Sequence, residues 1–351
     1  MIVSPRQRGV PRIRRTHRRP PTRHAQRGVA LLVAILLVAF GTIIAAAMAY
    51  NNAMTARRAA ATFEFDQALL VAEGGEALAA YGLQQTKKEN SQYTYPGQPW
   101  SQPLPPTEVT PGATLEASLE DVQGRFNIND LVTSDGNQPN TIAIQAFQRL
   151  LVELKLDPKW ADLIVDWIDK NTDPMSDGAE DSVYMEMNPP YRTPNLPITS
   201  TSELLALPGF TRAQFDVLAP YIVALPIGVQ INTCSASIYV LNALLPGSEP
   251  FSSDPQQFEK DRQAAGTCFP TPTEVLTAAG QGQGTNGAGT AAAPPAQSGQ
   301  QTLSSLIAGT STWFRLSSYI TLGNAQFSVY TLLYQDPTGM ARPVLRSFTP
   351  D

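Results

Sequence analysis

The sequence predicts an α+β fold, in which a long N-terminal membrane helix packs on an antiparallel sheet and the sheet carries a large inserted all-helical subdomain. Three observations predict this fold. The chain of 351 residues has a charge-free apolar stretch near its start, β-rich runs at both ends of the part that follows, and helical segments broken by proline or glycine between those runs. With 42% hydrophobic and 16% charged residues, the composition excludes collagen, complete disorder and a polytopic membrane protein.

The N-terminal helix is predicted over residues 29–83, with residues 29–50 crossing a membrane. No charged residue occurs between Arg27 and Arg57, and the 22 residues from Val29 to Tyr50 are almost all apolar. At about 1.5 Å per residue they span roughly 33 Å, which is enough for a bilayer core. Residues 51–83 continue without proline and are rich in helix formers. Residues 1–28 hold nine arginines and no acid, so we expect the N-terminus in the cytoplasm and the rest outside, which in a bacterium is the periplasm.

The remaining chain divides by its proline, glycine and β-strand patterns. A proline-rich linker is predicted over residues 84–113, followed by a sheet formed by residues 114–135 and 312–351. Residues 136–245 are expected to form the inserted helical domain, with helices at 141–154, 158–169, 202–207, 211–224 and 235–245. Residues 246–311 are expected to be loops, including a disordered low-complexity segment at 279–301.

The charge distribution excludes several function classes. Both histidines, His17 and His24, lie in the arginine-rich arm, so a chain that lacks residues 1–28 has no histidine general base and no imidazole metal ligand. Without the arm, 16 basic residues face 30 acidic ones, a net charge of -14. We therefore expect no nucleic-acid partner, because phosphate binding needs clustered Lys and Arg. Segments 203–210 and 232–247 resemble helix-hairpin-helix units, but their lack of basic residues favours a packing role.

One acidic stretch stands out as a candidate binding site. Six carboxylates fall within sixteen residues: Asp166, Asp169, Asp173, Asp177, Glu180 and Asp181. Hard oxygen ligands in an irregular loop suit Ca²⁺, although the spacing is not that of an EF-hand and the loop could instead be simply solvated. A general acid and base pair of a glycosidase is a weaker alternative, because nothing in the sequence fixes the separation of two carboxylates.

The two cysteines, Cys234 and Cys268, are expected to form a disulfide in an oxidising compartment. The alternative is a pair of buried thiols. A redox or zinc role is disfavoured, because the chain has no CxxC motif and no histidine after residue 28.

The junction Gln26-Arg27-Gly28-Val29 resembles a class III prepilin leader, in which basic residues and one glycine meet the apolar run directly. The resemblance implies that a prepilin peptidase cleaves after Gly28 and methylates the new amino terminus at Val29. Most pilin-like proteins have glutamate at the fifth mature position, where this chain has Val33. A buried intramembrane carboxylate needs a cation as partner, so its absence predicts a subunit at the end of a filament.

An ordered set of short motifs then resembles the K-type minor pseudopilins of the type II secretion system. The motifs are QGRFNIND at 123–130, DWID at 166–169, GAED at 178–181, PPYRTPN at 189–195, SEL at 202–204 and ALLPG at 243–247. The resemblance implies a pilin fold with a helical insertion, no enzymatic activity, and a place at the tip of the periplasmic pseudopilus beside the I-type and J-type minor pseudopilins. It also implies the major pseudopilin, the prepilin peptidase and the inner membrane as partners. Bound Ca²⁺ is implied as well, with Asp173, Asp177, Glu180, Asp181, Asn195 and Asp169 as its ligands.

Two other functions remain open at this stage. The first is a minor pilin of a type IV pilus or DNA-uptake system, for which salt-dependent DNA binding would be the mark. The second is a membrane-anchored periplasmic hydrolase, which turnover by the purified domain would reveal.

Overall fold

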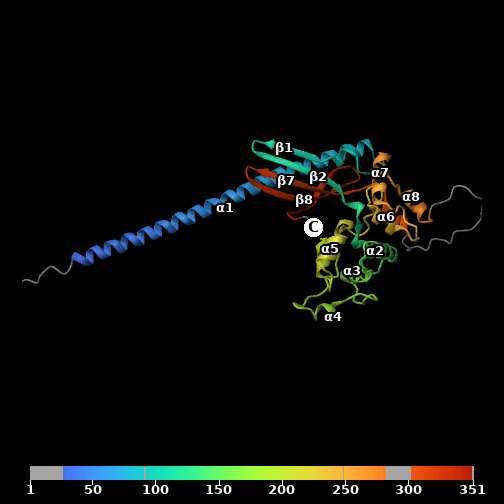
Figure 1. The fold of residues 1–351 in the computed structure, drawn as a ribbon, viewed down its shortest axis with the longest axis horizontal. Coiled ribbons are helices and arrows are strands. Elements are labelled where there is room, and N and C mark those ends of the chain that lie inside the picture. Colours follow the sequence, from blue (N-terminus) through green and yellow to red (C-terminus); the bar gives the residue numbers. More distant parts are fainter. Residues whose placement is uncertain (1–26, 91, 248, 282–301, 350–351) are drawn as a thin grey trace, which may run out of the picture. The chain divides into compact units, whose positions relative to one another are not determined.

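The computed structural model describes residues 27–90, 92–247, 249–281 and 302–349 (Figure 1). The chain divides into two compact units, one that ends at Phe63 and one that begins at Glu64. Most of the predicted leader, and the low-complexity segment apart from residues 279–281, lies outside the described residues.

Helix α1 (Arg27–Glu89) is continuous for 63 residues and runs six residues past the predicted end at Leu83. Lys87 and Lys88 lie in its last turn, where positive charge interacts favourably with the helix dipole, so the helix continues into the predicted linker. The apolar part reaches a mean hydropathy of 2.9 over 18 residues, none of them buried. By length and composition, α1 can cross a membrane.

The sheet has five antiparallel strands in the order β1-β2-β7-β8-β9. They are β1 (Leu104–Thr110), β2 (Ala113–Asp121), β7 (Trp313–Leu322), β8 (Ala325–Gln335) and β9 (Ala341–Ser347). The prediction missed β1, because Pro105 and Pro106 argue against a strand; both are tolerated because β1 lies at the edge of the sheet. The turn at Gly323 joins β7 to β8, and residues 336–339 join β8 to β9.

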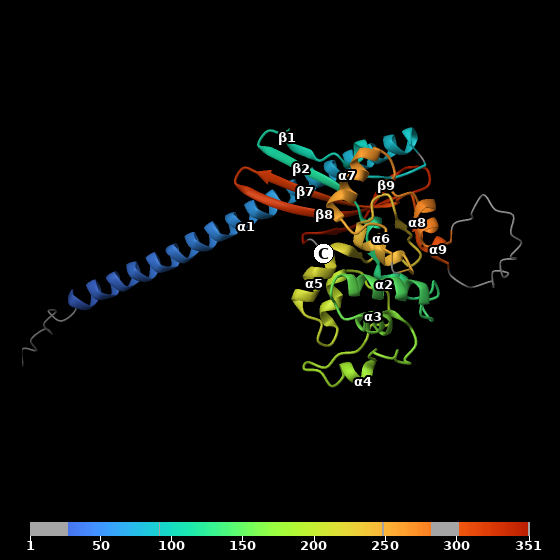
Figure 2. The ribbon, with the colours of Figure 1, turned by 45° about the vertical axis from the view of Figure 1, so that its right-hand side comes forward.

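The C-terminal part of α1 packs along this sheet (Figures 1 and 2). Ala68 and Ala72 are buried there, and a Cβ on Gly75 would lie 3.3 Å from a methyl carbon of Leu115 on β2. Small residues on this face therefore let the helix lie close to the strands. The apolar core beneath it includes Leu115, Phe314 and Leu333, each 2% exposed or less.

The helical insert, residues 122–312, connects β2 to β7 and has its own core around Phe147, Leu150 and Ile164. A short 3₁₀ helix, η2 (Pro99–Ser101), precedes β1. In chain order the insert contains η3 (Val122–Gly124), β3 (Phe126–Asn127), η4 (Ile128–Leu131), α2 (Thr141–Glu153), α3 (Trp160–Ile168), α4 (Asp181–Tyr184), η5 (Thr201–Ala206), α5 (Arg212–Leu218), η6 (Ala219–Tyr221), β4 (Ile222–Val223), β5 (Ile231–Asn232), α6 (Ile238–Leu244), α7 (Pro255–Ala265), α8 (Pro272–Ala278), α9 (Leu303–Leu306) and β6 (Ile307–Ala308).

The structure corrects the predicted limits of the insert in three ways. Residues 122–135 belong to the insert and not to the sheet, which β2 leaves at Asp121. The insert is not all-helical, because β3 pairs with β4 and β5 with β6 in two short parallel pairs, too short to show a period in the sequence. Residues 246–311 are not only loops: α7 and α8 begin at the N-caps Asp254 and Thr271, each followed by a proline.

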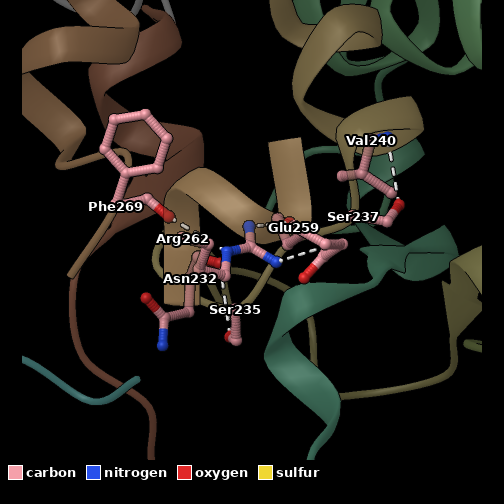
Figure 3. A network of polar contacts seen from close by, with 8 residues as sticks. Asn232, Ser235, Ser237, Val240, Glu259, Arg262 and Phe269 are labelled. Carbon is pink, nitrogen blue, oxygen red and sulfur yellow. Dashed lines mark hydrogen bonds and ion pairs between the residues drawn. The ribbon is translucent and has the colours of Figure 1, made fainter. Parts of the chain in front are cut away.

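A disulfide and a buried arginine connect the segment that contains α7 to the residues just before α6. Cys234 and Cys268 form the disulfide, with their Cα atoms 4.6 Å apart. Arg262 lies over the ring of Phe258 at 4.5 Å and donates a hydrogen bond to the carbonyl oxygen of Ala236. It also donates to the carbonyl oxygen of Phe269 and pairs with Glu259 (Figure 3). Burial lowers the pKa of Arg262, and the paired carboxylate of Glu259 opposes that change. The disulfide and Arg262 thus hold the segment around α7 against the residues that precede α6.

Candidate metal site in the acidic loop

The acidic loop, residues 169–195, is held by aspartates of α3. Asp162, Asp166 and the C-cap Asp169 follow one another at spacings of four and three residues, which places them on one side of the helix. The buried carboxylate of Asp166 accepts hydrogen bonds from the backbone N–H of Met175 at 3.0 and 3.1 Å. Asp162 accepts from the N–H of Asp177 at 3.2 Å. These two aspartates therefore fix the backbone of the loop.

Gly178 is required by this arrangement. A Cβ at this position would lie 1.9 Å from Oδ2 of Asp166, which is far inside van der Waals contact. Only glycine lets the loop pass over the Asp166 carboxylate. The GAED motif thus begins with a residue fixed by packing and continues to Glu180 and Asp181, two of the predicted ligands.

Three predicted ligands present buried oxygen atoms that lack a hydrogen-bond partner among the described residues. They are Oδ1 of Asp169, both carboxylate oxygens of Glu180, and Oδ1 of Asn195. Asn171 connects two of these residues, because its Nδ2 donates to Oδ2 of Asp169 at 2.7 Å and its carbonyl accepts from Nδ2 of Asn195 at 3.3 Å. Leaving buried oxygens without partners costs about 1 to 3 kcal/mol for each group, and more for a charged one.

The backbone at Asn195 supports a specific role for its side chain. Its φ of 49° lies in the left-handed region, which is uncommon outside glycine although asparagine is among the residues that tolerate it. Nδ2 of Asn195 donates to the carbonyl oxygen of Asn171, while its Oδ1 has no hydrogen-bond partner among the described residues.

The carboxylates of the loop also disfavour one another's ionisation. Burial, and to a lesser extent the negative charges of Glu180 and Asp169, raise the pKa of Asp166 to about 7. Burial likewise raises the pKa of Asp169 to about 6, with repulsion from Asp173. The pKa of Glu180 also rises to about 6, chiefly through burial and then through repulsion from Asp169 and Asp181; the hydroxyl of Thr193 opposes this rise without reaching hydrogen-bond geometry. A cation placed among these groups would relieve both the burial cost and the repulsion.

The other predicted ligands are placed differently. Asp181 already accepts hydrogen bonds from the backbone and hydroxyl of Thr193, each at 3.2 Å, and pairs with Arg192 at 3.2 Å. Asp173 and Asp177 are exposed, and neither carboxylate has a hydrogen-bond partner among the described residues. The structure therefore brings Asp169, Glu180 and Asn195 together, leaves Asp181 in a network of its own, and leaves Asp173 and Asp177 at the surface.

The donor chemistry fits Ca²⁺, although the ligand set is not closed. Within the described residues, no three Asp, Glu, His or Cys side chains converge on one point that could hold a metal ion. The free oxygens of Asp169, Glu180 and Asn195 are nevertheless the kind of donor that Ca²⁺ prefers, and the exposed Asp173 and Asp177 lie on the same loop. We therefore name these residues as the ones that would hold the ion.

The roles of Asp162 and Gly178 are not apparent from the sequence alone, and Asp166 is part of the acidic patch without being one of the predicted ligands. Asp166 could have been distinguished by its position inside the apolar helix WADLIVDWI, where a carboxylate must be buried and must find donors. The contact between Gly178 and Asp166 joins residues twelve positions apart, and no local sequence signal marks it.

Comparison with known proteins gives concordant results. A family model described as "Type II secretion system (T2SS), protein K" matches residues 124–227, which include the whole acidic loop. The type II secretion system protein K of Pseudomonas aeruginosa is 32% identical over 254 residues, covering 70% of this chain and 74% of that protein. The protein of the same name from Klebsiella pneumoniae is 33% identical over 252 residues, covering 69% and 77%.

A solved structure shares the fold. It is a chain of the GspK-GspI-GspJ complex from the type II secretion system of enterotoxigenic Escherichia coli, with a TM-score of 0.62 at 20% sequence identity. The match covers 84% of the present chain and all of the other.

Proposed function

The chain belongs to the type II secretion system protein K family, the K-type minor pseudopilins, and we propose that it caps the tip of the periplasmic pseudopilus together with I-type and J-type minor pseudopilins. The observation that carries the proposal is the large helical insert between β2 and β7 of a pilin-type sheet. Support for these partners comes from the similar E. coli chain, which was solved in a GspK-GspI-GspJ complex. The role is structural, and no catalytic step is proposed.

Two features of the chain favour the tip over the body of the filament. The insert adds residues 122–312 to one end of the sheet, where a further subunit stacked in register would need space. Val33 replaces the glutamate that would pair with the amino terminus of a neighbouring subunit. Steric and electrostatic terms therefore both oppose extension beyond this subunit.

The exposed side of α1 offers a surface for partner stems. Leu70, Leu78 and Tyr81 of α1 are 67%, 53% and 61% exposed. Leu78 and Tyr81 also line a hollow of about 280 Å³ beside Trp100 and Leu104, and none of its lining residues is charged. We propose that the stem helices of the other minor pseudopilins pack here through their apolar sides, in the manner of a coiled coil.

Membrane insertion and processing complete the proposal. We infer that the prepilin peptidase removes residues 1–28 by cleavage after Gly28 and methylates Val29, that α1 then crosses the inner membrane once, and that Glu64 onward lies in the periplasm. N-terminal mass spectrometry of the assembled protein should find a methylated Val29. An intact arginine-rich arm would contradict the processing, and normal cleavage of Gly28→Asp would contradict the role of the glycine.

The acidic loop is proposed to bind Ca²⁺ through Asp169, Glu180 and Asn195, with Asp173, Asp177 and Asp181 as further ligands. Its free buried oxygens and mutually raised pKa values support the proposal. When bound, the ion would supply the positive charge that the loop lacks, while Asp162 and Asp166 hold the loop backbone in place.

The tip position is tested by gene dosage and by co-purification. Expression of this protein alone should give no filaments, whereas raising its level beside the major pseudopilin should give more and shorter pseudopili. The I-type and J-type proteins should co-purify with it. Long homopolymers, or longer pseudopili at higher dose, would overturn the tip assignment.

A further inference from the structure

Arg57 and Arg58 form an exposed basic pair on α1 that the proposed function does not use. Neither guanidinium group has an ion-pair or hydrogen-bond partner among the described residues. The residues one helical turn away on either side are Ala, Met or Thr, so no carboxylate on the same helix can reach the pair at spacings of three or four. The two exposed guanidinium groups are therefore available to bind a partner outside the chain.

The position of the pair along α1 indicates what that partner is. If residues 1–28 are removed as proposed, Arg57 is the first charged side chain of the mature protein. It lies 28 residues after Val29 on an unbroken helix, a distance of about 42 Å. A bilayer with its headgroups is about 40–45 Å thick. With Val29 at the cytoplasmic surface, Arg57 and Arg58 lie at the level of the opposite headgroups.

We propose that Arg57 and Arg58 bind the phosphodiester groups of phospholipids in the outer leaflet of the inner membrane and fix the depth of α1 before assembly. A guanidinium group donates two parallel hydrogen bonds to a phosphate. Adjacent helix positions point about 100° apart, so the two side chains engage different lipids. The proposal rests on the membrane orientation proposed above.

The sequence around the pair explains why such an anchor is needed. Ala59, Ala60, Ala61 and Thr62 follow the two arginines, and Phe63 comes next. Without Arg57 and Arg58, no charged side chain would lie between Val29 and Phe63. The polar side chains of this stretch would be those of Thr42, Tyr50, Asn51, Asn52, Thr55 and Thr62, all of them uncharged. Such a helix could slide or tilt further into the bilayer. Positive charge on the outer side also opposes the usual bias toward basic cytoplasmic flanks, so the pair does not serve topology.

The test measures the depth of a label in vesicles. The processed chain, which begins at Val29 and carries Ala53→Cys, is labelled with a polarity-sensitive fluorophore; its native cysteines are protected in the disulfide. It is reconstituted in phosphatidylcholine, with and without phosphatidylglycerol, and quenched by lipids with spin labels in the headgroup or in mid-chain. Arg57→Ala with Arg58→Ala should move the label deeper by about one helical turn, roughly 5 Å. The shift should be larger with phosphatidylglycerol.

Two control variants and one alternative make the result decisive. Arg57→Lys with Arg58→Lys should keep the wild-type depth, and so should Lys87→Ala with Lys88→Ala, a basic pair 30 residues further along α1. Equal label depth in the wild type and the double alanine variant would overturn the proposal. If depth is unchanged but co-purification with the I-type and J-type proteins is lost, the pair binds an acidic partner chain and not lipid. Failure of the proposed function would instead appear as a wild-type chain that co-purifies with neither partner, whatever its depth.

Discussion

Two buried glutamates, Glu76 on α1 and Glu180 at the start of α4, are almost equally inaccessible at 5% and 7% exposure but have opposite surroundings. Glu76 accepts two hydrogen bonds from Arg346 on β9, each 2.7 Å, and one from the hydroxyl of Thr331 on β8 at 2.8 Å. Neither oxygen of Glu180 has a hydrogen-bond partner among the described residues, and its charged neighbours are carboxylates.

The difference teaches that one part of the fold supplies hydrogen-bond donors or counter-charges for its buried carboxylates and the other does not. Asp121, at the junction of sheet and insert, is satisfied by neutral donors: its buried carboxylate accepts from Asn232, Ser235 and Ser311. A buried charge without a cation or donors is not stable in water-excluded surroundings. The buried carboxylate of the sheet region is therefore paired within the chain, whereas Glu180 in the acidic loop has no positively charged or hydrogen-bonding partner among the described residues.

The largest effect is expected for Arg346→Met. This change leaves Glu76 buried with Thr331 as its remaining partner, and breaking a buried pair from one side typically costs about 3–5 kcal/mol of unfolding free energy. Because the Arg346 side chain is 35% exposed, we expect a loss near 3 kcal/mol in denaturant unfolding of the chain in detergent.

Two variants sharpen this prediction. Arg342→Met, on the same strand and 5.7 Å from the ring of Tyr334, should cost under about 1 kcal/mol. Replacing both members of the buried pair, Glu76→Leu with Arg346→Met, should recover most of the loss. Equal losses for Arg346→Met and Arg342→Met would show that the pair contributes no more than a surface contact.

The second effect is stabilisation of the wild type by calcium. An ion that binds only the folded state raises stability by RT ln(1 + [Ca²⁺]/Kd), about 2.7 kcal/mol at a hundred times Kd. Chelator should therefore lower the melting temperature of the wild type, and Glu180→Gln should abolish most of the difference. If the wild type gave the same melting curve in calcium and in chelator, the proposal that calcium stabilises the acidic loop would be contradicted.

The third effect is that of Gly178→Ala, which places a methyl group against the Asp166 carboxylate. Overpacking of this kind costs about 1–3 kcal/mol, and we expect it to weaken the calcium-dependent part of the stability most. Gly74→Ala is the matched control, because a Cβ there has no atom within 4 Å and alanine favours a helix. If Gly178→Ala lowered the stability equally with and without calcium, Gly178 would have no role in calcium binding.

Much of the fold follows from patterns in the sequence, and the exceptions have physical causes. The apolar charge-free stretch and the alternation in β2 are local signals, so α1 and β2 were predicted within a few residues of their start points. Strand β1 was missed because prolines argue against strands except at an edge, and edge position is a property of the assembled sheet. Helix α7 was missed because most of its residues are polar, although Asp254 and Pro255 are a recognisable helix-start signal in the sequence.

Some features of the candidate site can also be predicted from the sequence, and others cannot. A dense acidic patch is visible in the sequence, and so is the disulfide expectation for an exported chain, which the structure confirms. Which carboxylates are buried without partners is not visible, because it depends on how residues 169, 180 and 195 fold over α3. The separate roles of Asp166 and Asp169, three residues apart, arise only from that packing.

The smallest effect is a pH dependence whose sign depends on the cation. The pKa values of Asp166, Asp169 and Glu180 lie at about 7, 6 and 6 in the folded chain, above those of unfolded carboxyls, so in chelator the folded state binds more protons than the unfolded state between about pH 4 and 7. Unfolding free energy should then rise on acidification from pH 7 to pH 6, by about 1 kcal/mol. Asp130, whose burial raises its pKa to about 6, adds a calcium-independent part of the same sign. In saturating calcium the ion holds the loop carboxylates deprotonated, so acidification should instead release the ion and lower the stability. The unfolding free energy is measured at both pH values in calcium and in chelator. If acidification changed it with the same sign in both, the loop carboxylates would not be the groups that bind the cation.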